Sequence, residues 1–523
     1  MMQCSGIGLF CVMTAMCALS SADVFTDAEW LRDPVFTGVP VLNLFHREHE
    51  SKPELFGPTN VHTLFRKEIL LKERPISATI AVTGDDYFKF FLNDQFVIQG
   101  PAPSYHFTHP FFWIDAKEFL RAGPNCLAAH VYYQGLRNRV WNSADNRSGF
   151  MLALSVRYAD GTTDRFVSDA TWRCFQLEAF PTSETVGYQT QYLEHIDMRA
   201  MPRGWRAEGF DDSQWLEPLT GRQDHHFVQQ ITPPLQLTYW YPVKTQRMGN
   251  GRYVYDFGQV LVGHTRVRMH GPEGHVIVVR HAEELLESGA PRFDMRANCR
   301  YEELPVLSGE EDLIEFYDYR SFRYVEILDA LREPEVWVEV RHHPFDSDKA
   351  RFTSDNQLLE DIWTICRNGV QMGAQDVFVD CPSREKGQYL GDTLIAARSH
   401  MWLTADPTLT QKAVMDFAHS RHIHSGLMAV APGNFMQEIA EYSLQFPLLV
   451  LQYYRMSGDR TVAQFVADAV FEELFAYFAQ YENEVGLLAG IDKKNSKWVL
   501  VDWPENLRDE YDYNYSLERG NTV

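Results

Sequence analysis

The chain has 523 residues, enough for roughly two to four domains with sizeable hydrophobic cores. Hydrophobic residues make up 45% and charged residues 23% of it, which excludes a disordered or collagen-like chain. With 48 basic and 71 acidic residues the formal net charge is −23, so nucleic acid and anionic membrane surfaces are not expected as partners. The eight cysteines, three of them in an apolar leader, exclude a disulfide scaffold.

The leader, residues 1–22, carries no charged side chain and contains an apolar run from Ile7 to Leu19. Ala22 precedes Asp23, so the segment predicts a secretory signal peptide cleaved after Ala22. Because no basic residue stands near its start, a mis-assigned start codon on a cytoplasmic protein is the alternative. No other apolar run approaches the ~18 residues of a membrane span, so we expect a secreted or periplasmic protein that does not cross a membrane.

Residues 23–180 show the period-two alternation and closely spaced turns of antiparallel strands. The stretches Tyr87–Leu92 and Gln95–Gln99 flank Asn93-Asp94, a pair that accepts the positive φ angles of a two-residue hairpin turn. We therefore predict an N-terminal β-sandwich of the carbohydrate-binding kind over these residues.

A less regular stretch, residues 181–235, contains Pro233-Pro234 and is expected to be a linker or extension. Alternating apolar residues return over residues 236–346, for example in Phe322–Ile327. This second β block predicts a second β-sandwich.

The periodicity becomes helical at Ser354, which forms a capping-box pattern with Gln357. Further helices are predicted at about 388–403, from Asp406-Pro407 to Ala418, at about 442–456 before Gly458, and at about 461–480. The apolar positions at helical spacing in the first helix are Leu358, Leu359, Ile362, Trp363, Cys366 and Val370. About five helices without strand signals between them predict a partial all-α domain over 347–523.

The densest cluster of functional side chains runs from Asp380 to Asp392. A proline and a glycine keep its first half irregular, so we expect a loop that enters a helix N-terminus, where the helix dipole favours carboxylates. Asp380, Glu385, Asp392 and Arg384 would then converge on a small volume. Mutual repulsion and partial burial would raise the pKa of one carboxyl, as a general acid requires. A solvated, charge-rich helix start is the alternative.

A second candidate is Asp502-Trp503, because sugars bind where a hydrogen-bond acceptor lies beside a flat apolar ring. A buried core tryptophan is the alternative. His419, His422 and His424 have no carboxylate or cysteine at ligand spacing, so we predict no metal site there or elsewhere. No nucleotide-binding, serine-hydrolase or zincin motif is present, and no cofactor is expected.

Five runs carry a resemblance to a known family: Tyr255-Asp256-Phe257-Gly258-Gln259, Arg280-His281-Ala282-Glu283, Phe322-Arg323-Tyr324-Val325-Glu326, Asp380-Cys381-Pro382-Ser383-Arg384-Glu385 and Gly391-Asp392. In this order they resemble the bacterial α-L-rhamnosidases of glycoside hydrolase family 78, from about residue 60 to the end. The resemblance implies β-sandwich domains ahead of an (α/α)6 catalytic barrel, and inverting exo-hydrolysis of terminal α-L-rhamnosides in glycans or glycosides.

By position in the motif, the resemblance implies that Glu385 is the general acid. Inversion also needs a second carboxylate, about 6.5–9.5 Å away, that activates water from the opposite face of the sugar. Tyr389 stands where many family members have tryptophan, which affects stacking on the substrate. The resemblance implies catalytic roles for Asp380 and Asp392 beside Glu385, and substrate binding by Arg384, Tyr389, Asp502 and Trp503.

A complete (α/α)6 barrel has twelve helices and needs on the order of 300 residues with its loops. Residues 354–523 supply about 170, so we expect about half a barrel, a truncated product without the family's general base and inactive by itself. A rhamnose-containing glycan or glycoside is the expected partner, and the oligomeric state stays open. The alternatives are a non-catalytic carbohydrate-binding protein derived from this family, and another (α/α)6 sugar hydrolase or lyase.

Overall fold

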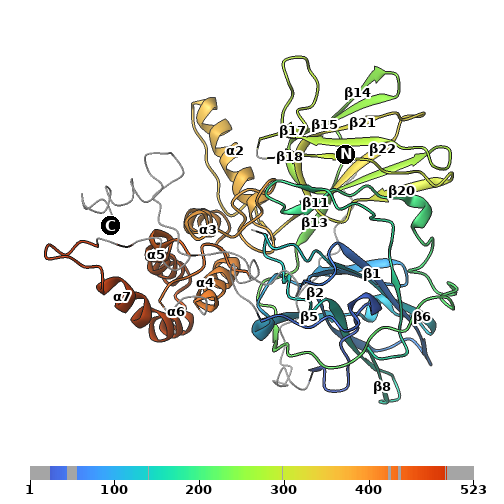
Figure 1. The fold of residues 1–523 in the computed structure, drawn as a ribbon, viewed down its shortest axis with the longest axis horizontal. Coiled ribbons are helices and arrows are strands. Elements are labelled where there is room, and N and C mark those ends of the chain that lie inside the picture. The colour runs from blue at the N-terminus through green and yellow to red at the C-terminus, as the bar shows by residue number, and fades with distance from the viewer. Residues whose placement is uncertain are drawn as a thin grey trace.

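The computed structural model describes residues 24–43, 56–138, 140–296, 298–421, 426–433, 438–488 and 491. Two β units lie side by side, and a layer of helices lies against them (Figure 1). The predicted fold class, β domains followed by a helical domain, is confirmed. The predicted signal peptide, residues 1–22, lies outside the described residues and stays a prediction.

The first β unit consists of two five-stranded sheets. Apolar side chains alternate along their strands and fill the space between them, among them Ile80, Phe88, Leu127 and Phe150. One sheet has the order β4 (Gln95–Gly100), β3 (Tyr87–Leu92), β6 (Gly123–Tyr133), β1 (Val61–Leu71) and β9 (Arg173–Gln176). The other has the order β12 (Phe227–Gln229), β5 (His109–Asp115), β2 (Ser77–Asp85), β7 (Gly149–Arg157) and β8 (Thr163–Val167).

The hairpin predicted at Asn93-Asp94 joins β3 to β4, and these two residues have φ angles of 51° and 65°. Residues 181–235, expected to be a linker, are part of the first β unit. Their strand β12 pairs in parallel with β5, with Phe227 opposite His109. The same stretch forms a small hairpin of β10 (Thr185–Val186) and β11 (Gln191–Tyr192).

The second β unit is one eight-stranded sheet with a two-stranded ribbon beside it. The long strand β15 (Arg252–His270) organises the sheet, because different parts of it pair with β14, β20, β21 and β22. The path through the sheet is β13 (Gln236–Trp240), β22 (Glu335–His342), β15, β21 (Arg320–Leu328), β16 (Val278–Ala282) and β19 (Glu302–Glu303). The remaining strands are β14 (Lys244–Gly249), β20 (Glu311–Glu315), β17 (Asp294–Met295) and β18 (Cys299–Arg300).

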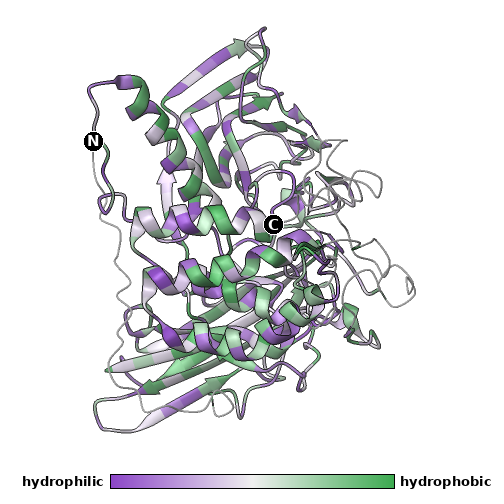
Figure 2. Cartoon of the chain, turned by 90° about the vertical axis from the view of Figure 1, so that its left-hand side faces the viewer, coloured by the Kyte–Doolittle hydropathy of each residue, from purple (hydrophilic) through white to green (hydrophobic). Residues whose placement is uncertain are grey.

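The predicted helices are present between residues 357 and 479. Their buried faces share a core that includes Leu409, Phe417, Phe446 and Leu474, while hydrophilic residues alternate with hydrophobic ones along the layer (Figure 2). Gly458 ends α5 in the left-handed conformation, as its place after the periodic run predicts. The helices are α2 (Gln357–Gly373), α3 (Leu390–Thr404), α4 (Thr408–Ser420), α5 (Ala440–Ser457), α6 (Arg460–Val466), a π-helical turn (Ala467–Phe471) and α7 (Glu472–Ala479).

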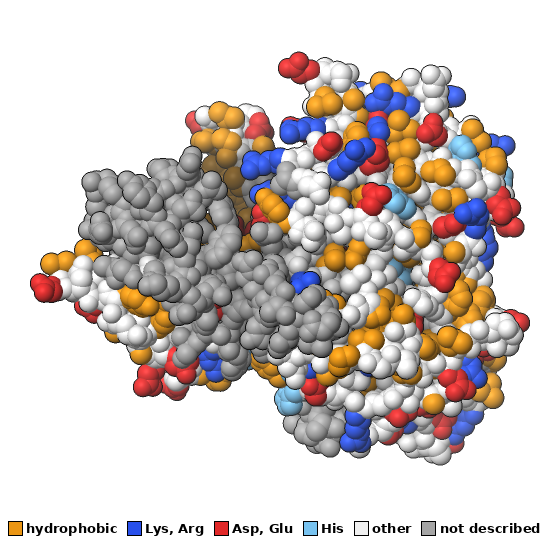
Figure 3. All heavy atoms as spheres, in the orientation of Figure 1, with side chains coloured by type: hydrophobic (Ala, Val, Ile, Leu, Met, Phe, Trp, Pro, Cys, Tyr) orange, Lys and Arg blue, Asp and Glu red, His pale blue; other side chains and the backbone are white. Residues whose placement is uncertain are grey.

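Helix α2 differs from its prediction in two respects. The side chain of Asn356, not that of Ser354, caps it by accepting a hydrogen bond from the Leu358 amide at 3.0 Å. Its apolar stripe is exposed to solvent, with Leu358 64% and Ile365 71% accessible, although amphipathic spacing predicts a buried face. Hydrophobic side chains are accordingly visible on the outside of α2 in Figure 3.

The visible surface carries acidic and basic side chains in a mixed pattern (Figure 3). In the part of the chain that the structure describes, no helix combines the length and the apolar character that a membrane crossing requires. The five cysteines within it are free thiols, consistent with the exclusion of a disulfide scaffold: Cys126, Cys174, Cys299, Cys366 and Cys381.

Candidate active site

The predicted catalytic segment forms a closed loop between the buried Val379 and helix α3. Its two ends are tied together, because the Asp380 amide donates to the Gly387 carbonyl at 2.9 Å and the Gly387 amide donates to Asp380 Oδ1 at 3.1 Å. Lys386, just before Gly387, has a φ of 56°, which turns the chain back toward α3. The predicted arrangement, a loop that enters a helix N-terminus, is present.

Side chains of the β units hold the backbone of this loop. Thr190 Oγ1 donates to the Arg384 carbonyl at 2.8 Å. Gln191 Nε2 and the Tyr301 hydroxyl both donate to the Ser383 carbonyl, at 3.0 and 2.9 Å. Because these donors come from the β10–β11 hairpin and from the segment between β18 and β19, the β units position the loop from outside the helical domain.

Lys386 anchors the loop through its charge. Its buried ammonium group donates to the two carboxylate oxygens of Asp318 at 3.0 and 3.1 Å and to the Tyr319 carbonyl at 2.9 Å. Burial lowers the pKa of Lys386 to about 8, and Asp318 opposes this shift, so the lysine stays cationic at neutral pH. Lys386 was not among the predicted site residues, because its partner Asp318 lies far away along the chain.

Arg320 supports this arrangement from within the second β unit. Its guanidinium group is 1% exposed, and Nε lies 3.1 Å from Glu303 Oε1. It also donates to Gln191 Oε1 at 2.8 Å and to the Tyr192 carbonyl at 3.0 Å. Arg320 therefore links the sheet to the hairpin whose Gln191 holds the loop from Asp380 to Gly387.

Three of the predicted site residues lie together in the loop. Arg384 Nε is 3.6 Å from Glu385 Oε1, and the Glu385 side chain is 17% exposed, so it is neither fully buried nor directed into open solvent. Burial, and next the neighbouring Glu385 carboxylate, raise the pKa of Asp380 to about 7. The raised carboxyl pKa that the charge cluster predicts is therefore found at Asp380.

Two other predicted residues lie where α3 begins. Asp392 is exposed in the first turn of α3, where the helix dipole favours a carboxylate. Tyr389 immediately precedes the helix and packs against the buried Val430 and Ile439, so part of its ring belongs to a local apolar cluster. Asp502, Trp503, His422 and His424 lie outside the described residues.

The raised pKa of Asp380 yields a testable prediction about stability. A carboxyl with a pKa near 4 in the unfolded chain and about 7 in the folded one binds more protons when folded, so its contribution to stability falls as the pH rises from about 4 to 7. We expect Asp380→Asn to increase the free energy of unfolding at pH 8 by roughly 1–3 kcal/mol and to change it little at pH 4. Urea unfolding at both pH values measures this, and an equal effect at the two would contradict it.

Family models match three successive parts of the chain. Residues 73–239 match the alpha-L-rhamnosidase N-terminal domain. Residues 246–342 match the concanavalin-like domain of bacterial alpha-L-rhamnosidases, and residues 347–518 match their 6 hairpin glycosidase domain. The models follow one another in the order of the two β units and the helical domain.

Two curated relatives are named alpha-L-rhamnosidase. The protein of Streptomyces avermitilis is 25% identical over 498 residues, which cover 88% of this chain and 47% of the relative. The protein of Formosa agariphila is 26% identical over 352 residues, covering 63% of this chain and 36% of the relative. The chain therefore spans about half or less of the length of these relatives.

Solved structures agree in fold. The α-L-rhamnosidase from Dictyoglumus thermophilum matches with a TM-score of 0.74 at 18% identity. The match covers 95% of this chain and 55% of that one. The Streptomyces avermitilis enzyme complexed with L-rhamnose has a TM-score of 0.71 at 23% identity, with 84% of this chain and 44% of that one covered. The three domain models and the relatives agree with the motif order, and the chain belongs to the bacterial α-L-rhamnosidase family, glycoside hydrolase family 78.

Proposed function

We propose that this protein, in its active form, is an inverting exo-α-L-rhamnosidase. Glu385 gives its proton to the oxygen of the departing aglycone as the glycosidic bond breaks. A second carboxylate takes a proton from the water that attacks the anomeric carbon from the opposite face. The observation that carries this proposal is the loop that holds Asp380, Arg384 and Glu385 together at the start of α3.

The surroundings of the loop suit a general acid. The β units fix its backbone, so the Glu385 carboxyl starts from a defined position rather than from a mobile surface loop. Arg384, 31% exposed, has donors for substrate hydroxyls, and Asp380 lies close enough to Glu385 for their charges to interact. We assign substrate contacts to Tyr389 and Asp392, and further contacts to Asp502 and Trp503.

We further propose that the general base belongs to a part of the protein outside these 523 residues. Relatives that share this chain's domains are about twice as long or longer, and a twelve-helix barrel needs more residues than the helical part supplies. On this proposal, the 523-residue chain releases no rhamnose by itself. The predicted leader suits secretion, where glycans are available as substrates.

The test is rhamnose release from an aryl α-L-rhamnoside, measured for this chain and for a longer product of the same gene. We expect release by the longer product only, with β-L-rhamnose as the first anomer seen by NMR. α-L-Rhamnose as the first product would contradict inversion, and release by the short chain would place the base within it. Binding of rhamnosides without release by any form would favour the non-catalytic carbohydrate-binding alternative.

A further inference from the structure

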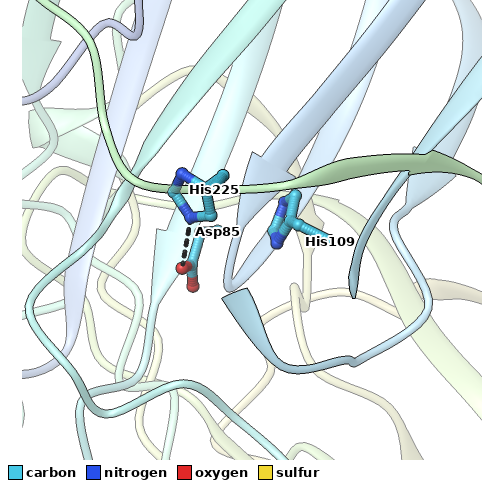
Figure 4. A group of neighbouring side chains, drawn as sticks. All are labelled: Asp85, His109 and His225. Carbon is cyan, nitrogen blue, oxygen red and sulfur yellow. Dashed lines mark ion pairs between the residues drawn. The ribbon is translucent and has the colours of Figure 1, made fainter. Parts of the chain in front are cut away.

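A cluster of unassigned polar side chains lies in the first β unit, away from the catalytic loop. Asp85, His109 and His225 each offer one ligand atom, and these atoms all lie within 4.8 Å of one another (Figure 4). Nothing in the sequence indicates the group, because its members are far apart along the chain and share no motif.

Strand pairing brings the three residues together. Asp85 is the last residue of β2 and His109 the first of β5, and these strands are antiparallel neighbours. The parallel pairing of β12 with β5 places Phe227 opposite His109, and His225 stands two residues before Phe227. The same register that builds the sheet edge therefore builds the cluster.

Three of the four ring nitrogens in the cluster have no hydrogen-bond partner among the described residues. His109 Nε2 and both ring nitrogens of His225 are buried without a hydrogen bond. Buried polar atoms of this kind are rare in folded proteins and call for an explanation, such as an ion. Asp85 and His109 are 4% and 5% exposed, and the His225 side chain is fully buried.

A direct hydrogen bond does not explain the geometry. Asp85 Oδ2 lies 3.6 Å from His225 Nε2, longer than a hydrogen bond. Two ligands that each lie about 2.0–2.1 Å from one tetrahedral ion are about 3.3 Å apart, close to the observed separation. The three ligand atoms lie within 4.8 Å of one another, so the more widely separated ones have to approach by on the order of 1 Å to hold a common ion.

The surroundings also suit a metal ligand set. His109 and His225 are both buried, and burial favours the neutral imidazole form, which presents a lone pair to a metal ion. His109 also hydrogen-bonds the Gly84 carbonyl, and since its Nε2 is unpartnered, this bond uses Nδ1 and leaves Nε2 as the acceptor. The Trp30 ring covers His225, with the ring centroids 4.4 Å apart.

A small cavity of about 30 Å³ borders Asp85 and His109. This is enough for one water molecule, which can complete a four-coordinate site. The nearby positive charge of Arg147 does not oppose a cation strongly, because Arg147 pairs with Asp145 and Asp224, each at 2.7 Å.

We propose that Asp85, His109 and His225 bind one divalent transition-metal ion, of which Zn²⁺ is the best match. Two imidazole nitrogens and a carboxylate favour Zn²⁺ and similar ions over Ca²⁺ and Mg²⁺, which prefer oxygen ligands. The ion joins β2, β5 and the segment that leads into β12, so its role is structural. It holds the segment before β12, part of the expected linker at residues 181–235, at the edge of the first β unit.

The test uses the 523-residue chain without a histidine tag, stripped with a chelator. We expect it to take up one Zn²⁺ per chain, to show the visible bands of four-coordinate Co²⁺, and to gain thermal stability when Zn²⁺ is added. Asp85→Asn and His225→Gln each weaken uptake by about tenfold or more and abolish the thermal gain. His275→Ala, which removes a histidine of the second β unit, leaves both unchanged.

The metal-binding measurements on the wild-type chain test the proposal even if a variant folds poorly. Thermal melting in the presence of chelator checks whether each variant is folded. Absence of Zn²⁺ and Co²⁺ binding by the wild-type chain overturns the proposal. Uptake that persists unchanged in both folded ligand variants also overturns it, because the ion is then held elsewhere.

Discussion

Replacing Glu385 with glutamine is expected to slow rhamnose release by the active form of the protein by a factor of about 10²–10⁴. Glutamine keeps the size of the side chain but has no acidic proton to give to the departing oxygen. The loss should depend on the leaving group. It should be largest for an alkyl rhamnoside, whose alkoxide needs protonation, and smallest for an aryl rhamnoside with an acidic phenol.

The matched control is Glu335→Gln on strand β22. Glu335 is 53% exposed and pairs only with surface Arg268 among the described residues, at 2.7 Å, so its loss should leave the rate unchanged. A uniform slowing by Glu385→Gln across all leaving groups would point to substrate positioning instead of proton transfer. An unchanged rate on the alkyl substrate would remove Glu385 from the mechanism.

Arg320→Met is expected to destabilise the second β unit by about 3–5 kcal/mol. Glu303 is 0% exposed, and Arg320 together with His281 counters the effect of burial on its pKa. Without Arg320 a buried carboxylate loses its main cation, and the Gln191 and Tyr192 oxygens lose a donor.

Urea unfolding followed by circular dichroism measures this loss, with Arg268→Met as the control. Arg268 also pairs with a glutamate, but it is 44% exposed, so its removal should cost at most about 0.5 kcal/mol. The double variant Arg320→Met/Glu303→Gln should recover part of the loss, because the unpaired charge is removed as well. Equal costs for the two arginine variants would contradict a special role for Arg320.

The parts of the fold that depend on local chemistry could be predicted from the sequence. The turn at Asn93-Asp94 and the end of α5 at Gly458 each follow from the backbone angles that those residues accept. The loop from Asp380 to Gly387 was predictable for the same reason, since a proline and a glycine interrupt a charged run. The exposure of α2 was not, because periodicity gives the width of an apolar face but not what covers it.

The tertiary contacts that hold the candidate site in place could not be predicted from the sequence. The contacts of Lys386 with Asp318, and of Ser383 with Tyr301, join a loop of the helical domain to the β units, so they depend on how these parts pack together. The cluster of Asp85, His109 and His225 depends in the same way on one parallel pairing, between β12 and β5. A single sequence shows which side chains are available, but not which of them meet across a sheet.

The dependence of the loop from Asp380 to Gly387 on the β units sets a rule for building chimeras. This chain's helical domain, grafted onto the sandwiches of a relative, would bring Glu385 but lose the donors at Thr190, Gln191 and Tyr301 and the counter-ion at Asp318. Such hybrids should fold yet misplace the acid unless the hairpin and the adjoining sheet edge are exchanged together with the barrel.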